Sequence, residues 1–249
     1  MFINEFFTCN LIKLEKLRKL IVIHALFLLL PSATFSAETG FGLNLTALDR
    51  YVRKPDPNYS YEIAEIIDGG DHKTFIIEIT SQKWLTEKEV NYPLWEHYMV
   101  VVAPNELKSD IGFLTITGGS KTNSTPTKAP QGDIKRAMET GTVVSTLYMV
   151  PNQPLVFSDD NGLQRTEDSI IAYTWDKYLR TNDDNWPLRL PMTKAAVRAM
   201  DTVTDLMISD VGEKRIVNKF VVAGGSKRGW TTWTTAIVDK RVVAIMPIV

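Results

Sequence analysis

A serine preceded by two glycines stands where an apolar run passes into a helix-forming stretch. The run Lys219–Ala223 is typical of a strand buried on both faces, and Gly224-Gly225-Ser226-Lys227-Arg228-Gly229 follows it directly. A sharp turn from strand to helix lifts a serine hydroxyl clear of a sheet and presents the next backbone amide. Ser226 is therefore the candidate nucleophile. The amide of Lys227 is a candidate donor to the oxyanion that forms when a carbonyl is attacked.

The spacing of the glycines differs from that of the usual nucleophile elbow. The elbow of α/β-hydrolases reads G-x-S-x-G, whereas this chain reads G-x-S-x-x-G, with Arg228 in place of the second glycine. The alternative is a tight strand-to-helix connection whose serine only caps the helix. The side chains of Lys227 and Arg228 can add positive charge beside an oxyanion, but cations at a helix start more often face solvent, which is the expectation here.

A second pair of glycines follows another apolar strand upstream of the elbow. Gly118 and Gly119 come directly after the strand that ends near Thr117, and Ser120 follows them. A second oxyanion amide belongs at this position of the fold. We therefore predict that the amide of Gly119 or Ser120 is this donor, the alternative being an ordinary glycine-rich turn.

The residues that would activate the serine are missing from the expected part of the chain. In this fold the order is serine, then Asp or Glu, then histidine. The three histidines, His24, His72 and His97, all precede Ser226, and a structural role explains each of them better. The only acid after Ser226 is Asp239, expected to be exposed. The triad cannot be assembled from these residues, so we expect the front part of a truncated hydrolase with little or no triad-dependent turnover.

The hydrophobic pattern predicts an α/β fold of the α/β-hydrolase type. A hairpin over 59–67 and 75–79 and strands over 97–103 and 111–117 come first, and their short connections predict antiparallel pairing. Helices then alternate with strands, which predicts parallel pairing with right-handed crossovers. These helices cover 132–140, 166–179 and 192–209 and continue after the elbow to 238, and the strands cover 143–149, 219–223 and 242–246. The fold class is thus a mostly parallel sheet with antiparallel N-terminal strands, truncated on its C-terminal side.

The first 37 residues read as a signal peptide, and residues 38–249 as the N-terminal portion of the hydrolase-like domain. Four cations precede an eleven-residue apolar run over 20–30, and small residues follow it. Export is therefore expected, with membrane contact only through this segment. The remaining chain carries a net charge of −3, which does not favour nucleic acid. Its only cysteine, Cys9, lies in the removed part, so no disulfide or thiolate metal site is expected, and no cofactor either.

Several separate blocks of sequence resemble one known family in the same order. The blocks are Thr46–Val52, Pro55–Tyr59, Glu167–Trp175, Arg189–Ala195 and Gly224–Trp233. From about residue 44 to the end, the chain resembles the PhoPQ-activated pathogenicity-related proteins (PqaA type). The resemblance implies an exported α/β-hydrolase-like protein linked in bacteria to virulence and to resistance against antimicrobial peptides. It places Trp230 and Trp233 on the elbow helix, where core packing is the expected role.

The resemblance leaves the substrate open, as a small molecule or a peptide. The elbow is also similar to that of glucuronoyl esterases, in which the cation after the serine assists the oxyanion, and by analogy this favours ester hydrolysis. Glu167 and Asp168 are explained by the helix dipole without a catalytic duty. Two alternatives stay open. One is a non-enzymatic exported protein that uses the fold as a scaffold, and the other is a fragment whose last strand leaves an apolar edge exposed.

Overall fold

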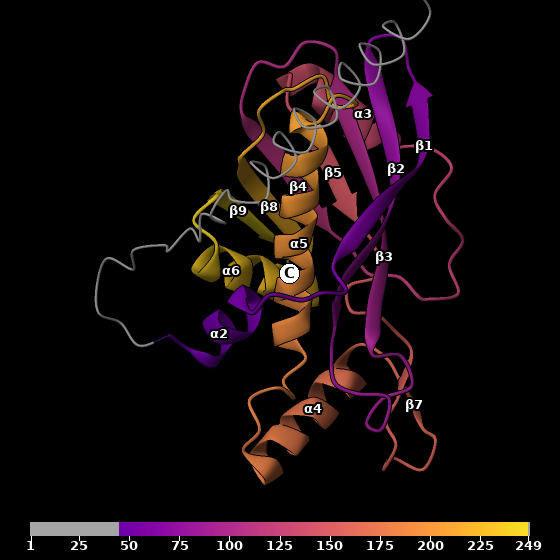
Figure 1. Cartoon of the computed structure of the whole chain (residues 1–249), viewed down its shortest axis with the longest axis vertical. Helices are drawn as coiled ribbons and strands as arrows, with labels where there is room; N and C mark the ends of the chain where they lie inside the picture. The colour runs from indigo at the N-terminus through magenta and orange to yellow at the C-terminus, as the bar shows by residue number, and fades with distance from the viewer. Residues whose placement is uncertain (1–44, 249) are drawn as a thin grey trace, which may run out of the picture. The chain divides into compact units, whose positions relative to one another are not determined.

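The computed structural model describes residues 45–248, which form an α/β fold around a seven-stranded sheet (Figure 1). The expected signal segment 1–37 lies outside the described residues. The sheet order is β1-β2-β3-β5-β4-β8-β9. Its strands, in chain order, are β1 (Ser60–Asp68), β2 (His72–Lys83), β3 (Leu94–Pro104), β4 (Ile111–Ile116), β5 (Val144–Leu147), β8 (Lys219–Gly225) and β9 (Val242–Ile248).

The strand directions confirm a mostly parallel sheet with an antiparallel N-terminal part. β1 pairs antiparallel with β2, and β3 pairs antiparallel with β2 and β5, whereas β5, β4, β8 and β9 are mutually parallel. The expectation that strand 111–117 belongs to the antiparallel group is wrong. Although the connection between β3 and β4 is short, the two strands are not neighbours, because β5 lies between them. β4 therefore pairs only with β5 and β8, both in parallel.

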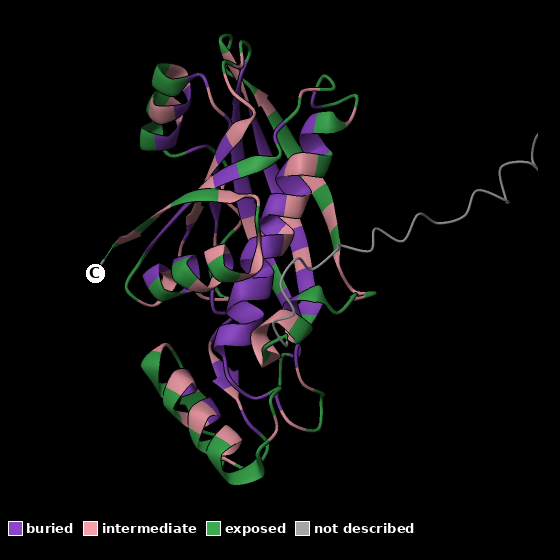
Figure 2. Ribbon diagram, turned by 90° about the vertical axis from the view of Figure 1, so that its left-hand side faces the viewer, coloured by how far each residue is buried: buried purple, intermediate pink, exposed green. Residues whose placement is uncertain are grey.

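Helices cover both faces of the sheet. The helices are α2 (Ala47–Arg53), α3 (Gln131–Thr140), α4 (Asp168–Thr181), α5 (Arg189–Ile208) and α6 (Lys227–Val238), and a small separate ribbon pairs β6 (Leu155–Val156) with β7 (Gln164–Arg165). α3 packs on one face through Ala137, in a cluster with Ile76 and Val100. α5 belongs to the larger core and is the most buried helix (Figure 2). No helix within residues 45–248 has the length and apolar character needed to cross a membrane.

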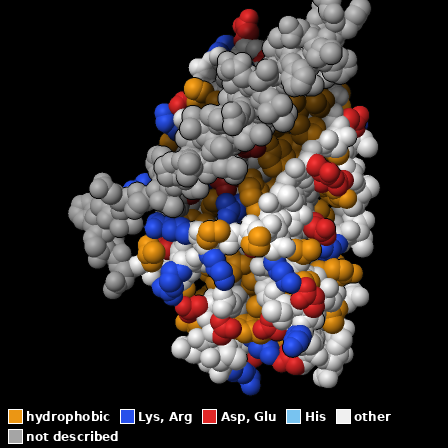
Figure 3. All heavy atoms as spheres, viewed as in Figure 1, with side chains coloured by type: hydrophobic (Ala, Val, Ile, Leu, Met, Phe, Trp, Pro, Cys, Tyr) orange, Lys and Arg blue, Asp and Glu red, His pale blue; other side chains and the backbone are white. Residues whose placement is uncertain are grey.

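The helix α5 starts three residues earlier than expected, and one stripe of its side chains lies in the core. Val197, Met200, Val203 and Met207 expose 8% or less of their surface. Part of the outer surface carries many charged side chains. Acidic and basic side chains intermingle over the lower part of the face in Figure 3, and ion pairs such as Arg180–Asp176 on α4 belong to this type of surface. Such exposed pairs contribute little to stability.

The edge strand β9 is only partly covered. β9 carries apolar residues on both faces, which is typical of a buried parallel strand, yet Val243, Met246 and Ile248 are each half exposed. On α6, Trp230 and Trp233 are 47% and 55% exposed, so the expectation that both pack in the core is wrong for the described residues. These side chains point away from the core because α6 meets the sheet through the opposite side, with Thr231 and Thr235 buried.

Candidate active site

Ser226 occupies a strained turn at the carboxyl end of β8. Its φ is 55° and its ψ is −120°, a combination that side-chain-bearing residues rarely adopt. The residue is exposed, and its amide donates a 2.7 Å hydrogen bond to the carbonyl of Ile248 on β9. The turn therefore holds the hydroxyl at the surface, at the start of α6. This is the backbone arrangement of a nucleophile elbow.

Close backbone contacts explain two glycines of the elbow. A Cβ at Gly224 would lie 2.5 Å from the carbonyl oxygen of Arg228, and one at Gly229 would lie 3.0 Å from the carbonyl oxygen of Ile248. A Cβ at Gly225 would meet nothing within 4 Å. The second glycine that a close backbone contact requires is therefore Gly229, one residue later than in G-x-S-x-G. Position 228 can carry a long side chain.

The loop after β4 lies beside the elbow. β4 and β8 pair in parallel as far as Ile116 and Gly224, so both chains leave the sheet at the same edge. Gly119 has a φ of 137°, which favours glycine. Within residues 45–248, the amides of Gly119 and Lys227 donate no hydrogen bond, whereas the amide of Ser120 donates to Oδ1 of Asn123 over 2.5 Å. Of the two predicted donors in this loop, the hydrogen bonds therefore favour Gly119.

Arg228 is held inside the site, so the expectation that it faces solvent is wrong. Its side chain is 11% exposed, and its two terminal nitrogens donate to the carboxylate of Glu167 over 2.9 and 2.5 Å. Its Nε donates to the carbonyl of Val150. The guanidinium lies against Gly118, where a Cβ would come within 2.4 Å of Nη2. Arg228 therefore ties the helix start to the loop that carries Gly119.

Glu167 is the centre of this network, which the sequence analysis did not find. Its carboxylate also accepts from Nε2 of Gln153 over 2.8 Å, and its amide donates to the side chain of Gln153. Gln153 in turn donates to the carbonyl of Gly119 over 3.0 Å. Burial alone would raise the pKa of Glu167, but the hydrogen bonds from Arg228 and Gln153 outweigh it and lower the pKa. The helix dipole therefore does not account for Glu167, whose φ of 50° marks a second strained position.

Lys227 and Asp168 form a more exposed pair on the rim of the site. Nζ of Lys227 lies 3.1 Å from Asp168 and 3.6 Å from Glu167, and its side chain is 22% exposed. Asp168 is 78% exposed. The side chain of Lys227 is thus less exposed than expected, while Asp168 has the surface position that the helix-dipole explanation implies.

No candidate base or acid of a triad contacts Ser226 within the described residues. His72 lies at the turn between β1 and β2 and hydrogen-bonds Asp71, and His97 is buried in β3. Asp239 was expected to be exposed, but its side chain is only 12% exposed because Arg241 binds it. Residues 45–248 also contain no group of three or more His, Cys, Asp or Glu that can hold a metal ion.

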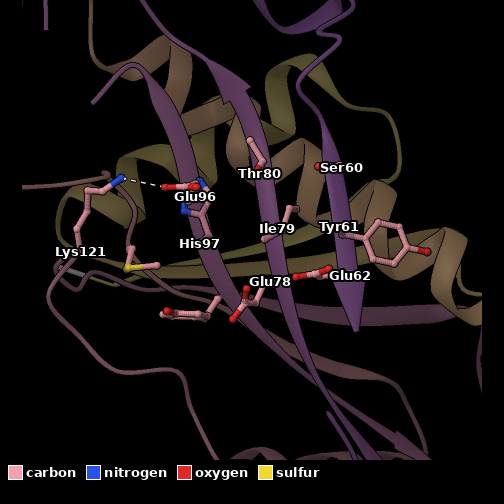
Figure 4. Close-up of a pocket in the computed structure, with 11 residues that line it drawn as sticks. Ser60, Tyr61, Glu62, Glu78, Ile79, Thr80, Glu96, His97 and Lys121 are labelled. Carbon is pink, nitrogen blue, oxygen red and sulfur yellow. Dashed lines mark hydrogen bonds and ion pairs between the residues drawn. The ribbon is translucent and has the colours of Figure 1, made fainter. Parts of the chain in front are cut away.

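Two adjoining pockets lie next to the loop that carries Gly119. The smaller, of about 320 Å³, includes Gly118, Gly119 and Tyr148 in its wall. The larger, of about 520 Å³, extends over β1, β2 and β3 and is shown in Figure 4. Tyr98 and Met149 line both pockets. Three carboxylates face the larger pocket, and its one lysine pairs with one of them: the residues are Glu62, Glu78, Glu96 and Lys121.

Comparison with known proteins places the chain in a family. The family model described as PhoPQ-activated pathogenicity-related protein matches residues 48–249. Autocrine proliferation repressor protein A of Dictyostelium discoideum is 39% identical over 206 residues, which are 82% of this chain and 41% of that protein. The chain thus spans less than half the length of this curated relative.

Solved esterase structures share the fold at low sequence identity. The acetyl xylan esterase of Paenibacillus sp. R4 matches 82% of this chain and 59% of its own, with 14% identity and a TM-score of 0.50. Acetyl xylan esterase 1 of Thermoanaerobacterium sp. JW/SL YS485 matches 81% and 56%, with 13% identity and a TM-score of 0.50. These likenesses concern the α/β-hydrolase-type fold alone. On its match over residues 48–249, the chain belongs to the PhoPQ-activated pathogenicity-related protein family.

Proposed function

We propose that this protein is a serine hydrolase that acts on an ester or an amide, with Ser226 as the nucleophile. The observation that carries the proposal is the strained, exposed backbone of Ser226 at the carboxyl end of a parallel strand. The amides of Lys227 and Gly119 serve as oxyanion donors, since neither donates a hydrogen bond within the described residues. In this role they stabilise the negative charge that develops on the carbonyl oxygen.

The substrate enters through the two adjoining pockets. The smaller pocket has Gly118 and Gly119 in its wall, and at Tyr98 and Met149 it adjoins the larger pocket on the carboxylate-lined face of β1, β2 and β3. An elongated small molecule or a peptide fits this path. Export through segment 1–37 and a role in virulence belong to the same proposal. The sequence pattern of that segment supports export, and the description of the family as pathogenicity-related supports virulence.

The base and the orienting acid belong, in this proposal, to a further part of a longer protein. The support is that no histidine hydrogen-bonds Ser226 within residues 45–248, and that the chain spans 59% of an esterase with the same fold. The oxyanion donors and substrate binding can still give a residual rate without the triad.

A fluorophosphonate probe, which labels activated serines covalently, tests the nucleophile. The chain is treated with the probe alone and with added imidazole, which supplies a diffusible base. Labelling is expected to be weak alone, stronger with imidazole, and abolished in Ser226→Ala. Ser81→Ala, which alters a buried serine, is the matched control and is expected to label like the wild type. Absence of Ser226-dependent labelling under both conditions would reject the hydrolase.

The second candidate is a non-enzymatic exported protein that uses the fold as a binding scaffold. The specific observation in its favour is the name of the Dictyostelium relative, a proliferation repressor, which describes signalling and not hydrolysis. No histidine within residues 45–248 hydrogen-bonds Ser226, which fits this candidate as well. The same labelling experiment separates the two candidates, because a scaffold needs no reactive serine.

A further inference from the structure

Arg189, the first residue of α5, is a buried cation beside the elbow without an acidic partner. The residue is 6% exposed, and its Nη1 donates a 2.9 Å hydrogen bond to the carbonyl of Lys227. Its Nε is buried and has no hydrogen-bond partner. No carboxylate between residues 45 and 248 forms an ion pair with Arg189. A buried guanidinium of this kind is costly unless an anion compensates its charge.

A second arginine on the same helix shows what Arg189 lacks. Arg198 also has a buried Nε without a partner, and it also stacks on an aromatic ring, that of Tyr59 at 4.8 Å. Unlike Arg189, it has a carboxylate, since its Nη1 lies 2.8 Å from Asp201. The two arginines share an orphaned Nε and an aromatic neighbour, and they differ in the anion.

The orientation of Arg189 is fixed towards the first turn of α6. Its guanidinium carbon lies 3.8 Å from the centre of the Trp230 ring, and α5 and α6 pack against each other (Figure 1). Burial lowers the pKa of Arg189 to about 10, so the side chain is still charged at neutral pH. Trp230 compensates part of this charge through a cation–π contact. The positive charge is therefore held in place next to the residues that follow Ser226.

The charges around the elbow do not balance. Lys227 pairs with Asp168, and Arg228 pairs with Glu167. Arg189 remains as the cation without an ion-pair partner, although the charge of Asp168 also acts on it, and the amino end of the twelve-residue helix α6 adds partial positive charge. An anion at this place would meet both the guanidinium and the helix start.

We propose that Arg189 and the first turn of α6 form a subsite for a carboxylate group of the ligand that binds at Ser226. The guanidinium matches a planar carboxylate in shape and in charge. The carboxylate is either a substituent of the substrate or the acid that ester hydrolysis releases. The inference rests on the proposed function for the ligand's role as substrate or product, but binding itself is measured without turnover.

Acetate is the probe of this subsite, and the fluorescence of Trp230 is the reporter. The chain is titrated with sodium acetate at constant ionic strength, with sodium chloride as the reference salt. A saturable acetate-specific change in fluorescence and a rise in Tm are expected. Arg189→Gln should weaken acetate binding at least tenfold, while the matched variant Arg198→Gln should bind acetate like the wild type. Trp230→Phe should remove the fluorescence change and keep the rise in Tm.

Further variants distinguish a failure of the carboxylate subsite from a folding defect and from a failure of the hydrolase proposal. If Arg189→Gln does not fold by circular dichroism, Arg189→Lys replaces it, and a three- to tenfold weakening is expected from the lost planar geometry. Ser226→Ala should keep acetate binding whether or not Ser226 reacts with a fluorophosphonate, so a failure of the hydrolase proposal is distinguishable. The subsite is rejected if acetate acts no differently from chloride, or if Arg189→Gln binds like the wild type.

Two comparisons identify the source and the class of the anion. A version of the protein extended to the length of its relatives should still bind acetate. Loss of binding in that version means that a carboxylate of the chain itself fills the site, which overturns the proposal. Inorganic phosphate should bind no more tightly than acetate. A phosphate affinity more than tenfold higher would overturn the assignment to carboxylates.

Discussion

Two serines in this molecule each have half of what a serine nucleophile needs. Ser226 is exposed in a strained turn and has no histidine within hydrogen-bonding reach among the described residues. Ser81 on β2 is fully buried, and its hydroxyl lies 3.0 Å from Nε2 of His97 on β3. A substrate can reach Ser226, but no histidine of the described residues lies beside it to act as a base. Ser81 has a histidine beside it, but its burial keeps a substrate away.

The buried pair shows why a serine–histidine hydrogen bond does not by itself indicate catalysis. Nδ1 of His97 is 3.0 Å from the carbonyl oxygen of Tyr148, which only accepts, so Nδ1 carries the proton and Nε2 accepts from Ser81. Burial lowers the pKa of His97 to about 4. A base with this pKa is far from the value near neutrality that favours general-base catalysis. Accessibility and backbone strain therefore identify the functional serine better than the hydrogen bond does.

The largest effect should come from a methyl group that destroys the elbow and leaves the buried pair intact. Gly224→Ala places a Cβ 2.5 Å from the carbonyl oxygen of Arg228, so the turn must open. We expect a loss of about 3 kcal/mol in the free energy of unfolding and complete loss of fluorophosphonate labelling. Gly225→Ala, whose Cβ meets nothing within 4 Å, is the control and should stay within about 0.5 kcal/mol in urea denaturation. Equal effects of the two variants would contradict the geometry of the elbow.

The buried Ser81–His97 pair should make the free energy of unfolding depend on pH. The folded pKa of His97, about 4, lies below its unfolded value of about 6.5. As the pH falls from 6.5 to 4, His97 takes up a proton in the unfolded chain but not in the folded protein. The free energy of unfolding therefore declines by about 3 kcal/mol through this group. His97→Gln should remove this part of the slope in urea denaturation at several pH values. A slope that is the same in His97→Gln and in the wild type would contradict this assignment.

The sequence predicts the elements that position the elbow better than it predicts the contacts around it. Local hydrophobic patterns indicated β8, α6 and the glycines after β4, and the structure has these elements within a few residues of the expected bounds. The direction of β4 was wrong because it depends on β5, a strand that follows later and inserts between β3 and β4. The local hydrophobic pattern of a strand does not show which distant strand it pairs with.

The network around Arg228 could not be derived from spacing for a similar reason. Glu167 lies 61 positions from Arg228 in the chain, and the two meet only because α4 starts near the elbow. Two signals were present in the sequence. Arg228 replaces a glycine of the usual elbow, and Gly118 leaves room for a large neighbour. Neither signal identifies the carboxylate that completes the contact.

Breaking the Arg228–Glu167 contact should affect the elbow more weakly than the glycine variant does. Glu167→Gln removes one charge and keeps the shape, and we expect a loss of about 2 kcal/mol, since hydrogen bonds to charged groups contribute roughly 1.5–3 kcal/mol. The amide of Met149, which donates a hydrogen bond to the carbonyl of Gly118, should exchange hydrogen faster, as measured by mass spectrometry. Asp168→Asn, a neighbouring carboxylate that is 78% exposed, is the matched control and should leave this exchange unchanged.

The smallest effect should follow removal of the hydroxyl of Ser81. Ser81→Ala leaves Nε2 of His97 without its donor, and a buried acceptor without a partner costs about 1–2 kcal/mol. Fluorophosphonate labelling should stay at the level of the wild type, because Ser226 and the loop with Gly119 share no hydrogen bond with this pair. A drop in labelling without loss of stability would show that the buried pair acts on the elbow. In that case burial would no longer separate the structural serine from the reactive one.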